Sequence, residues 1–392
     1  MKDSNIKIGR RKFLKAAGAV GAATLVASCS EGGDAGADCI GAPAVLRKKR
    51  SLKMVTTWPK NFPGIGTGAE RVARRITELT DGGLDIRVYG AGELVPALGA
   101  FDAVSQGKAD IYHGAEYYWQ GKSRAFNFFA AVPFGMTAGE MKAWIYHDGG
   151  QELWDELSAA FNIKPFMAGN SGTQMGGWFR SELKGLADLQ GLRMRIPGLG
   201  GEVMARMGAV PVTKAGGELF LALSQGNIDA TEWIGPWNDL AFGFHTIAKY
   251  YYYPGFHEPG TTLSMGMNLD LWEDLSNQER AAVESAAAAE NDYTLAEFNA
   301  QNARALTTLI EEHGVKLTRF PDEILDAMAR LSVEVLAETA ASDALTGRVY
   351  ESFAASMART SRWGEIGERA FTEIREKAMT IAAMASRVDH GG

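Results

Sequence analysis

A stretch of 37 residues without proline or glycine, from 277 to 313, constrains the fold of this chain most strongly. Ser276 begins a capping-box pattern at its start, and Gly314 follows its end. At about 1.5 Å per residue, one unbroken helix of this length would measure about 55 Å, which exceeds the width of a small domain. We therefore expect a helix that spans two lobes or bends between them. Apolar residues at steps of three and four along it are Val283, Ala286, Ala289, Tyr293, Ala296, Ala300, Ala303, Leu306 and Ile310.

Before this helix, the chain alternates short β-rich runs with helical segments. The expected strands are 52–57, 84–89, 109–113, 164–168, 192–196, 210–213, 229–233 and 261–267. Strands separated by helices predict an α/β fold with open sheets. After Leu271 the pattern is almost wholly helical.

One short segment occurs twice in this α/β region. AVSQGKAD at 103–110 matches ALSQGNID at 222–229 without a gap, with five identical positions in eight. Each copy ends a helix at a glycine and enters a strand, so we interpret the pair as one structural unit used once in each of two similar lobes. The residues that follow the two copies would face one cleft. They are Tyr112, His113, Tyr117, Tyr118 and Trp119 on one side, and Thr231, Glu232, Trp233 and Trp237 on the other.

The N-terminus indicates export from the cytoplasm. Arg10 and Arg11 precede an uncharged stretch, 16–28, that is too short to span a bilayer but suits a signal-peptide core. The paired arginines predict a twin-arginine signal over residues 1–28. The segment 29–50 would then be a flexible tether, with Cys29 either lipidated or simply near an ordinary cleavage site.

Composition and motifs disfavour several classes of function. The net charge of −7 argues against nucleic-acid binding, and two cysteines, Cys29 and Cys39, exclude a disulfide scaffold. The sequence has no nucleophile-elbow, zinc-protease or phosphate-loop motif, and none of its six histidines is spaced with a catalytic partner. A secreted hydrolase is therefore the weaker alternative, and we expect a protein that is not an enzyme.

Three motifs, together with the export signal and the long helix, resemble a known family. They are AGNSGTQ at 168–174, GLRMRIP at 191–197 and QGNIDATEW at 225–233. In this order they resemble the periplasmic solute-binding subunits of TRAP transporters, over nearly all of residues 52–390. Within that family the chain looks most like the α-keto-acid binders, which hold a small 2-oxo monocarboxylate, such as pyruvate, together with a cation. Lactate or another organic acid is the alternative ligand, and the membrane permease of the transporter is the implied partner.

These features together predict a two-lobed periplasmic binding protein with open sheets, which closes on its ligand by hinge motion. The expected divisions are lobe 1 at 51–172 and 262–275, lobe 2 at 173–261, the long helix and helices packing on both lobes at 276–363, and a C-terminal helical region at 364–392.

Arg195 is the expected carboxylate clamp. It ends a strand just before Ile196 and Pro197, and a guanidinium at such an edge matches a carboxylate bidentately. Arg193, two residues earlier, would share the same face, but the resemblance selects Arg195 and leaves Arg193 as a surface residue.

Glu232 is the second unusual residue, because an unpaired carboxylate beside a large aromatic residue is costly to bury. The resemblance implies that Glu232, the backbone carbonyl of Trp233, and Gln174 ligate a metal ion. Such hard oxygen donors suit Na⁺ or Ca²⁺. The charges of Arg195, Glu232, one ligand carboxylate and Na⁺ cancel, whereas Ca²⁺ would leave one positive charge unless Asp239 lies near.

The rest of the ligand site is expected to be aromatic. Tyr118 and Trp58 are the aromatic residues that we select for it, from their positions at strand ends. Asn170 could donate a hydrogen bond to a keto oxygen, and Gln174 is a second polar residue that we select as a contact of the ligand.

The last helical segment carries its own apolar stripe between 365 and 387. Its members are Ile366, Ala370, Ile374, Ala378, Ile381 and Ala385. Such a terminal helix can fold back on its own chain or pack on a second copy by exchange. The α-keto-acid binders that this chain resembles include dimers with an exchanged C-terminal helix, so both arrangements stay open.

Overall fold

Short strands form two separate β-sheets in the computed structural model, which describes residues 49–388 and their side chains up to Ile381. The first sheet has the strand order β2-β1-β3-β10-β4. Its strands are β1 (Arg50–Thr56), β2 (Leu84–Tyr89), β3 (Ile111–Gly114), β4 (Ile163–Asn170) and β10 (Thr262–Asn268). β1 is parallel to β2 and β3, and β10 is antiparallel to β3 and β4, so the sheet is mixed.

The second sheet has the order β11-β9-β5-β8-β6-β7 and is also mixed. Its strands are β5 (Gly177–Phe179), β6 (Arg193–Arg195), β7 (Val210–Val212), β8 (Ala230–Thr231), β9 (Tyr250–Tyr253) and β11 (Lys316–Arg319). The two-lobed α/β fold with open sheets is therefore confirmed. Two connections run between the sheets, from β4 to β5 and from β9 to β10. The expected lobe boundaries at 172/173 and 261/262 stay predictions.

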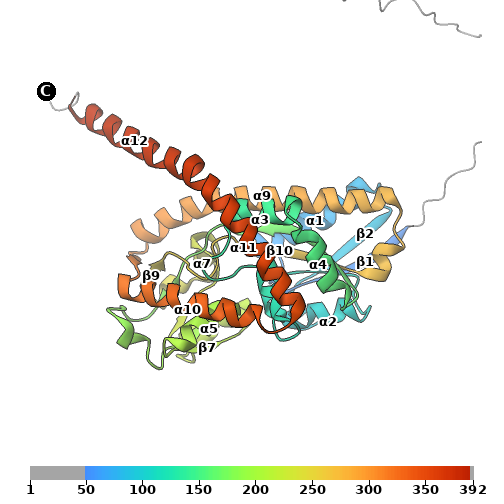
Figure 1. Ribbon diagram of the computed structural model, residues 1–392, viewed down its shortest axis with the longest axis horizontal. Coiled ribbons are helices and arrows are strands. Elements are labelled where there is room, and N and C mark those ends of the chain that lie inside the picture. The colour runs from blue at the N-terminus through green and yellow to red at the C-terminus, as the bar shows by residue number, and fades with distance from the viewer. Residues whose placement is uncertain (1–48, 389–392) are drawn as a thin grey trace, which may run out of the picture. The chain divides into compact units, whose positions relative to one another are not determined.

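Helices connect the strands and cover the sheets (Figure 1). In the first part of the chain they are α1 (Ile65–Leu79), α2 (Ala100–Ser105), α3 (Ala138–His147), α4 (Gly150–Ala159), α5 (Gly198–Arg206), α6 (Leu219–Ser224), α7 (Pro236–Phe242) and α8 (Leu269–Glu273). Those that follow are α9 (Asn277–Glu311), α10 (Asp322–Ala340), α11 (Ala344–Gly364) and α12 (Ala370–Val388). None of the described helices is long and apolar enough to cross a membrane.

The repeated segment forms the unit that the sequence predicts. In each copy a short helix, α2 or α6, ends before a glycine with positive φ, Gly107 at 68° or Gly226 at 71°. The aspartate that ends each copy then accepts a hydrogen bond from a neighbouring parallel strand: Asp110 from the amide of Lys53, and Asp229 from the amide of Arg193. The same local device thus starts β3 in one sheet and β8 in the other.

Helix α9 is a single helix of 35 residues, as expected, and it packs against both lobes (Figure 1). Val283 belongs to an apolar cluster with residues of the first sheet, and Phe298 to a cluster that includes Trp178 of the second sheet. The expected apolar stripe is partly wrong, because Tyr293 and Ile310 are 50% and 39% exposed. An alanine-rich helix has a weak apolar face, and polar residues take up part of the buried face instead.

One of those buried polar residues is Glu290, which is fully buried on α9. Its carboxylate pairs with Arg71 of α1 at 2.8 Å, and Thr294 donates a hydrogen bond to it at 2.7 Å. The ion pair and the hydrogen bond offset the cost of burying this charge.

The C-terminal region is one continuous helical segment in which α11 leads through a π-helical turn, Glu365–Arg369, into α12. The expected stripe is exposed: Ile366 by 74%, Ile374 by 63% and Ile381 by 68%. Over the described residues this stripe does not fold back on its own chain (Figure 1).

The expected signal peptide, most of the tether, Cys29 and Cys39 lie outside the described residues. Arg50, which we placed at the end of the tether, is instead the first residue of β1 and forms an ion pair with Asp274 at 2.7 Å.

Candidate functional site

Neighbouring parallel strands of the second sheet place Arg195 beside Glu232. Arg195 is the last residue of β6 and pairs in register with Thr231 of β8, so Glu232 leaves the sheet at the same edge. The exposed fraction of the side chain is 1% for Arg195 and 0% for Glu232, and Nη1 of Arg195 forms an ion pair with the Glu232 carboxylate. Burial alone would lower the pKa of Arg195, but Glu232 together with the other acidic groups around the guanidinium raises it.

Every nitrogen of this guanidinium has a partner. Nη1 also donates to the carbonyl of Glu232 at 3.1 Å, Nε to the carbonyl of Lys214 at 3.2 Å, and Nη2 to the hydroxyl of Tyr118 at 3.4 Å. The indole of Trp233 lies 5.0 Å from the guanidinium carbon. Tyr118 belongs to the first lobe, so Arg195 joins the two lobes.

Arg193 has a different environment although it lies on the same strand. Its guanidinium pairs with Asp229 at 2.6 Å, and its side chain is 45% exposed. It is a surface residue, as expected.

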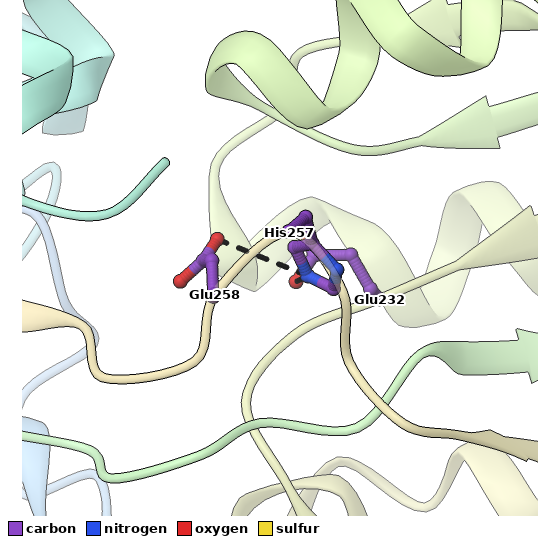
Figure 2. Close-up of side chains that lie close together, drawn as sticks. All are labelled: Glu232, His257 and Glu258. Carbon is purple, nitrogen blue, oxygen red and sulfur yellow. Dashed lines mark hydrogen bonds and ion pairs between the residues drawn. The ribbon is translucent and has the colours of Figure 1, made fainter. Parts of the chain in front are cut away.

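His257 and Glu258 complete a buried ionisable group with Glu232 (Figure 2). His257 Nε2 lies 3.3 Å from one oxygen of Glu232 and 4.0 Å from one oxygen of Glu258. The other oxygen of Glu258 accepts hydrogen bonds from Thr261 at 2.6 Å and Tyr117 at 3.4 Å. Sequence reasoning missed both residues, since they lie 25 and 26 positions after Glu232 with no spacing pattern that links them to it. The available signal was a histidine and a glutamate side by side in a connection between lobes.

Burial and the neighbouring charges shift the protonation of this group. Burial, followed by the charge of Glu232, raises the pKa of Glu258 to about 7. Burial alone would lower the pKa of His257, but its hydrogen bond to Glu232 raises it. The group can therefore hold a proton near neutral pH.

Gln174 lies on the connection from β4 to β5, and its backbone forms hydrogen bonds with the connection from β9 to β10. Its amide donates to the carbonyl of Glu258 at 3.1 Å, and its carbonyl accepts from Gly255 at 3.1 Å. The side-chain nitrogen donates to Ser171 at 3.0 Å and Thr261 at 3.1 Å, whereas the buried oxygen Oε1 has no hydrogen-bond partner. A buried carbonyl oxygen without a hydrogen-bond partner can serve as a ligand atom for a hard cation.

Trp58 lies beside the clamp and is 2% exposed. Its ring centroid lies 6.2 Å from those of both Tyr118 and Trp233, and its Nε1 donates to Nδ1 of His113 at 2.8 Å. Burial lowers the pKa of His113 to about 4, which keeps the ring neutral and able to accept this bond. His113 thus orients Trp58, a role that the sequence did not indicate.

Asn170 and Asp239 both make hydrogen bonds within the protein, and the ligand contact expected of Asn170 stays a prediction. The side chain of Asn170 donates to the carbonyl of Gly260 at 3.2 Å and accepts from the amide of Gly172 at 2.8 Å, so it ties together the two connections. Asp239 accepts hydrogen bonds from Trp178 at 2.9 Å and Tyr251 at 2.6 Å in the second lobe. The second carboxylate beside Glu232 is that of Glu258, and not that of Asp239.

The donor set fits a hard cation and a small carboxylate. Glu232, Glu258 and the unpaired oxygen of Gln174 supply oxygen donors, and Arg195 supplies a planar guanidinium. The arrangement combines groups from both lobes and both connections, which is typical of a ligand site between lobes.

Comparison with known proteins identifies the family. Residues 54–343 match DctP, the bacterial extracellular solute-binding protein family 7. A monocarboxylate 2-oxoacid-binding periplasmic protein of Nostoc sp. (strain PCC 7120) is 40% identical over 362 residues, which cover 92% of this chain and 97% of that protein.

Two solved structures share both fold and sequence. A TRAP periplasmic solute-binding protein from Pseudoalteromonas atlantica T6c, with bound sodium and pyruvate, is 39% identical with a TM-score of 0.81, over 83% of this chain and 99% of that one. A TRAP transporter solute-binding protein from Bordetella bronchiseptica RB50 is 36% identical with a TM-score of 0.83, over 85% of this chain and 98% of that one. It is a dimer of mixed occupancy, with calcium and picolinate in its occupied site. The chain therefore belongs to the DctP family and is a TRAP periplasmic solute-binding protein, a binding component of transport and not an enzyme.

Proposed function

We propose that this protein captures a small 2-oxo monocarboxylate such as pyruvate, together with a cation, and delivers it to a TRAP membrane permease. The observation that supports this most directly is the buried Arg195, whose guanidinium lies between Glu232 of its own lobe and Tyr118 of the other. The Nostoc relative binds 2-oxoacids, and the Pseudoalteromonas relative holds pyruvate.

In this proposal Arg195 binds the ligand carboxylate, while Trp58 and Tyr118 form the wall beside it. Gln174, Glu232 and the backbone carbonyl of Trp233 ligate the cation, Na⁺ or Ca²⁺, and Gln174 also contacts the ligand. The cation supplies positive charge between Glu232 and the ligand carboxylate, and so links the two. Asn170 donates a hydrogen bond to the keto oxygen of the ligand, and its contacts with Gly260 and Gly172 hold it in place.

A thermal-shift screen tests the ligand class. The mature protein would be screened against 2-oxo acids, lactate, dicarboxylates and sugar acids, each with Na⁺, with Ca²⁺ and without either. We expect the largest stabilisation with pyruvate-like acids and only when a cation is present. Equal stabilisation by dicarboxylates or sugar acids would contradict the assignment, and preference for lactate would select the alternative ligand of the same family.

We further propose that the exposed stripe of α12 packs on a second copy of the chain. Its exposed isoleucines and the dimeric Bordetella relative support this arrangement. Export by a twin-arginine signal, and an anchor at Cys29, complete the proposal for a periplasmic protein held near its permease. Metabolic labelling with a palmitate analogue, compared between the wild type and Cys29→Ser, tests the anchor.

A further inference from the structure

An ion pair outside the ligand site joins the two lobes. Arg124 begins a 3₁₀ helix, Arg124–Phe129, in the connection from β3 to β4 of the first sheet. Its Nη2 donates hydrogen bonds at 2.7 Å to the carboxylate of Glu202 on α5 and at 2.7 Å to the hydroxyl of Thr339 on α10. Helix α5 connects two strands of the second sheet, and α10 packs along it (Figure 1). One nitrogen of Arg124 therefore holds both α5 and the helix packed on it.

The surfaces beside this ion pair are in close contact. Gly198 and Glu202 lie one turn apart on the same face of α5. A Cβ atom on Gly198 would lie 3.3 Å from Oδ1 of Asn127 and 3.4 Å from Cβ of Tyr117. Asn127 also donates a hydrogen bond to the carbonyl of Arg124 at 2.9 Å. One face of α5 therefore packs on the first lobe, and the ion pair lies at the rim of this contact, where the side chains of Arg124 and Glu202 are 32% and 31% exposed.

The two segments that the ion pair joins also carry residues of the proposed ligand site. Tyr118 precedes Arg124 in the same connection of the first lobe, and Arg195 precedes Glu202 at the end of β6. Nη2 of Arg195 donates to the hydroxyl of Tyr118 at 3.4 Å, which is long for a hydrogen bond. Because α5 starts soon after Arg195, and the helical turn with Tyr118 packs on the one with Arg124, the ion pair affects how closely the two ligand-site side chains approach.

We propose that Arg124 is a positioning residue for ligand binding, and that its contacts with Glu202 and Thr339 hold α5 against the first lobe and slow the release of the ligand. Arg124 does not touch the ligand in this scheme. It acts on the approach of Tyr118 to Arg195, so its loss favours opening of the cleft. The inference rests on the proposed function, because pyruvate is the ligand whose release is measured.

Arg206 provides a matched control on the same helix. It lies one turn after Glu202, and its guanidinium pairs with Glu334 at 3.4 Å and with Glu338. Both carboxylates belong to α10, so these contacts join α5 to α10 and involve no residue of the first lobe. Arg206→Met should therefore remove ion pairs of the same kind and leave ligand release unchanged.

Stopped-flow tryptophan fluorescence measures the release of pyruvate in saturating Ca²⁺. Trp58 and Trp233 lie beside the clamp and serve as reporters. We expect Arg124→Met to increase the dissociation rate about fivefold and to change the association rate less than about twofold, because the contact between the lobes is completed after the ligand has entered.

Glu202→Gln tests the same contact from the other lobe. If Arg124 acts through Glu202, the double variant should release pyruvate at about the rate of Arg124→Met alone. The proposal is overturned if Arg124→Met releases pyruvate within about twofold of the wild-type rate, if the effects of the two substitutions multiply, or if Arg206→Met accelerates release equally.

Hydrogen exchange of the ligand-free protein separates a failure of this inference from a failure of the proposed function. Amides of the segment Arg124–Phe129 and of α5 should exchange faster in Arg124→Met than in the wild type, and at the wild-type rate in Arg206→Met. This exchange pattern in a protein that binds no pyruvate would contradict the proposed function alone. Unchanged exchange in Arg124→Met would overturn the inference, whatever ligand the protein binds.

Discussion

The guanidinium of Arg195 and the carboxylate of Glu232 form an ion pair in which both side chains are almost fully buried, at 1% and 0% exposure. In the proposed site one member binds the ligand carboxylate and the other binds the cation. Without ligand and cation, each therefore neutralises the other. In this proposal the ligand and the cation replace these paired charges on binding.

Replacing Arg195 should remove ligand binding. Loss of a bidentate, charge-assisted pair in a closed site costs about 3 kcal/mol, so Arg195→Ala should weaken pyruvate affinity at least about a hundredfold, and Arg195→Lys somewhat less. Calorimetry measures the change. Arg193→Ala is the control, because its exposed pair with Asp229 contributes little, and it should bind nearly normally. Unchanged affinity in Arg195→Ala would eliminate the clamp assignment.

The same substitution should also destabilise the protein, because it leaves Glu232 buried without its main counter-charge. We expect Arg195→Ala to lower the free energy of unfolding by about 3 kcal/mol. The double variant Arg195→Met, Glu232→Gln removes both charges and should recover most of that loss without recovering pyruvate binding. Denaturant unfolding of both variants tests this, and equal destabilisation of the two would argue against an unpaired charge as the cause.

Glu232→Gln should weaken cation and ligand binding together, because each stabilises the charge that the other brings. We expect a loss of about tenfold or more for each, with cation affinity measured with and without saturating pyruvate. Asp229→Asn is a matched control three residues earlier, at an exposed ion pair. Identical pyruvate affinity of the wild type in metal-free buffer and in saturating Na⁺ or Ca²⁺ would refute the bridge.

Glu116 should make stability fall as the pH rises. Burial raises the pKa of Glu116 to about 7, so between its ordinary pKa of about 4.5 and pH 7 the folded protein binds more protons than the unfolded chain. Protonated Glu116 therefore stabilises the folded protein at pH values below about 4.5, and this contribution is lost as the pH rises from about 4.5 to 7. Glu116→Gln keeps an acceptor for Tyr112 but does not titrate, so its unfolding free energy should fall less than that of the wild type from pH 5 to pH 8, by about 2 kcal/mol. Parallel slopes for the two proteins would contradict this assignment.

Removal of the residues after Trp363 should convert a dimer into a monomer. The truncation deletes the exposed stripe that contains Ile366, Ile374 and Ile381, while Arg195 and Glu232 lie elsewhere. Light scattering should report the halved mass, and pyruvate affinity should stay within about threefold. A full-length mature protein that is monomeric at all concentrations would exclude exchange of this helix.

Local patterns were sufficient to predict much of the fold. The capping box at Ser276 and the glycine at 314 bracketed the long helix, because caps and breakers act within a few residues. The repeated segment predicted two equivalent helix-to-strand turns, which the structure contains at Gly107 and Gly226. The buried face of α9 was harder to predict, because Glu290 lies on it. Its ion pair with Arg71 of α1, about 220 residues earlier in the chain, makes that burial possible.

By itself, the sequence determined the alternation of strands and helices, the length of α9, the family resemblance, and Arg195 and Glu232 as unusual residues, since each depends on neighbours along the chain. The tertiary structure decided that Arg195 is paired with Glu232, that His113 orients Trp58, and that Glu258 and His257 lie beside Glu232. These contacts join segments tens of residues apart, and the protonation of each group depends on burial and on charges that only the folded chain brings within a few ångströms.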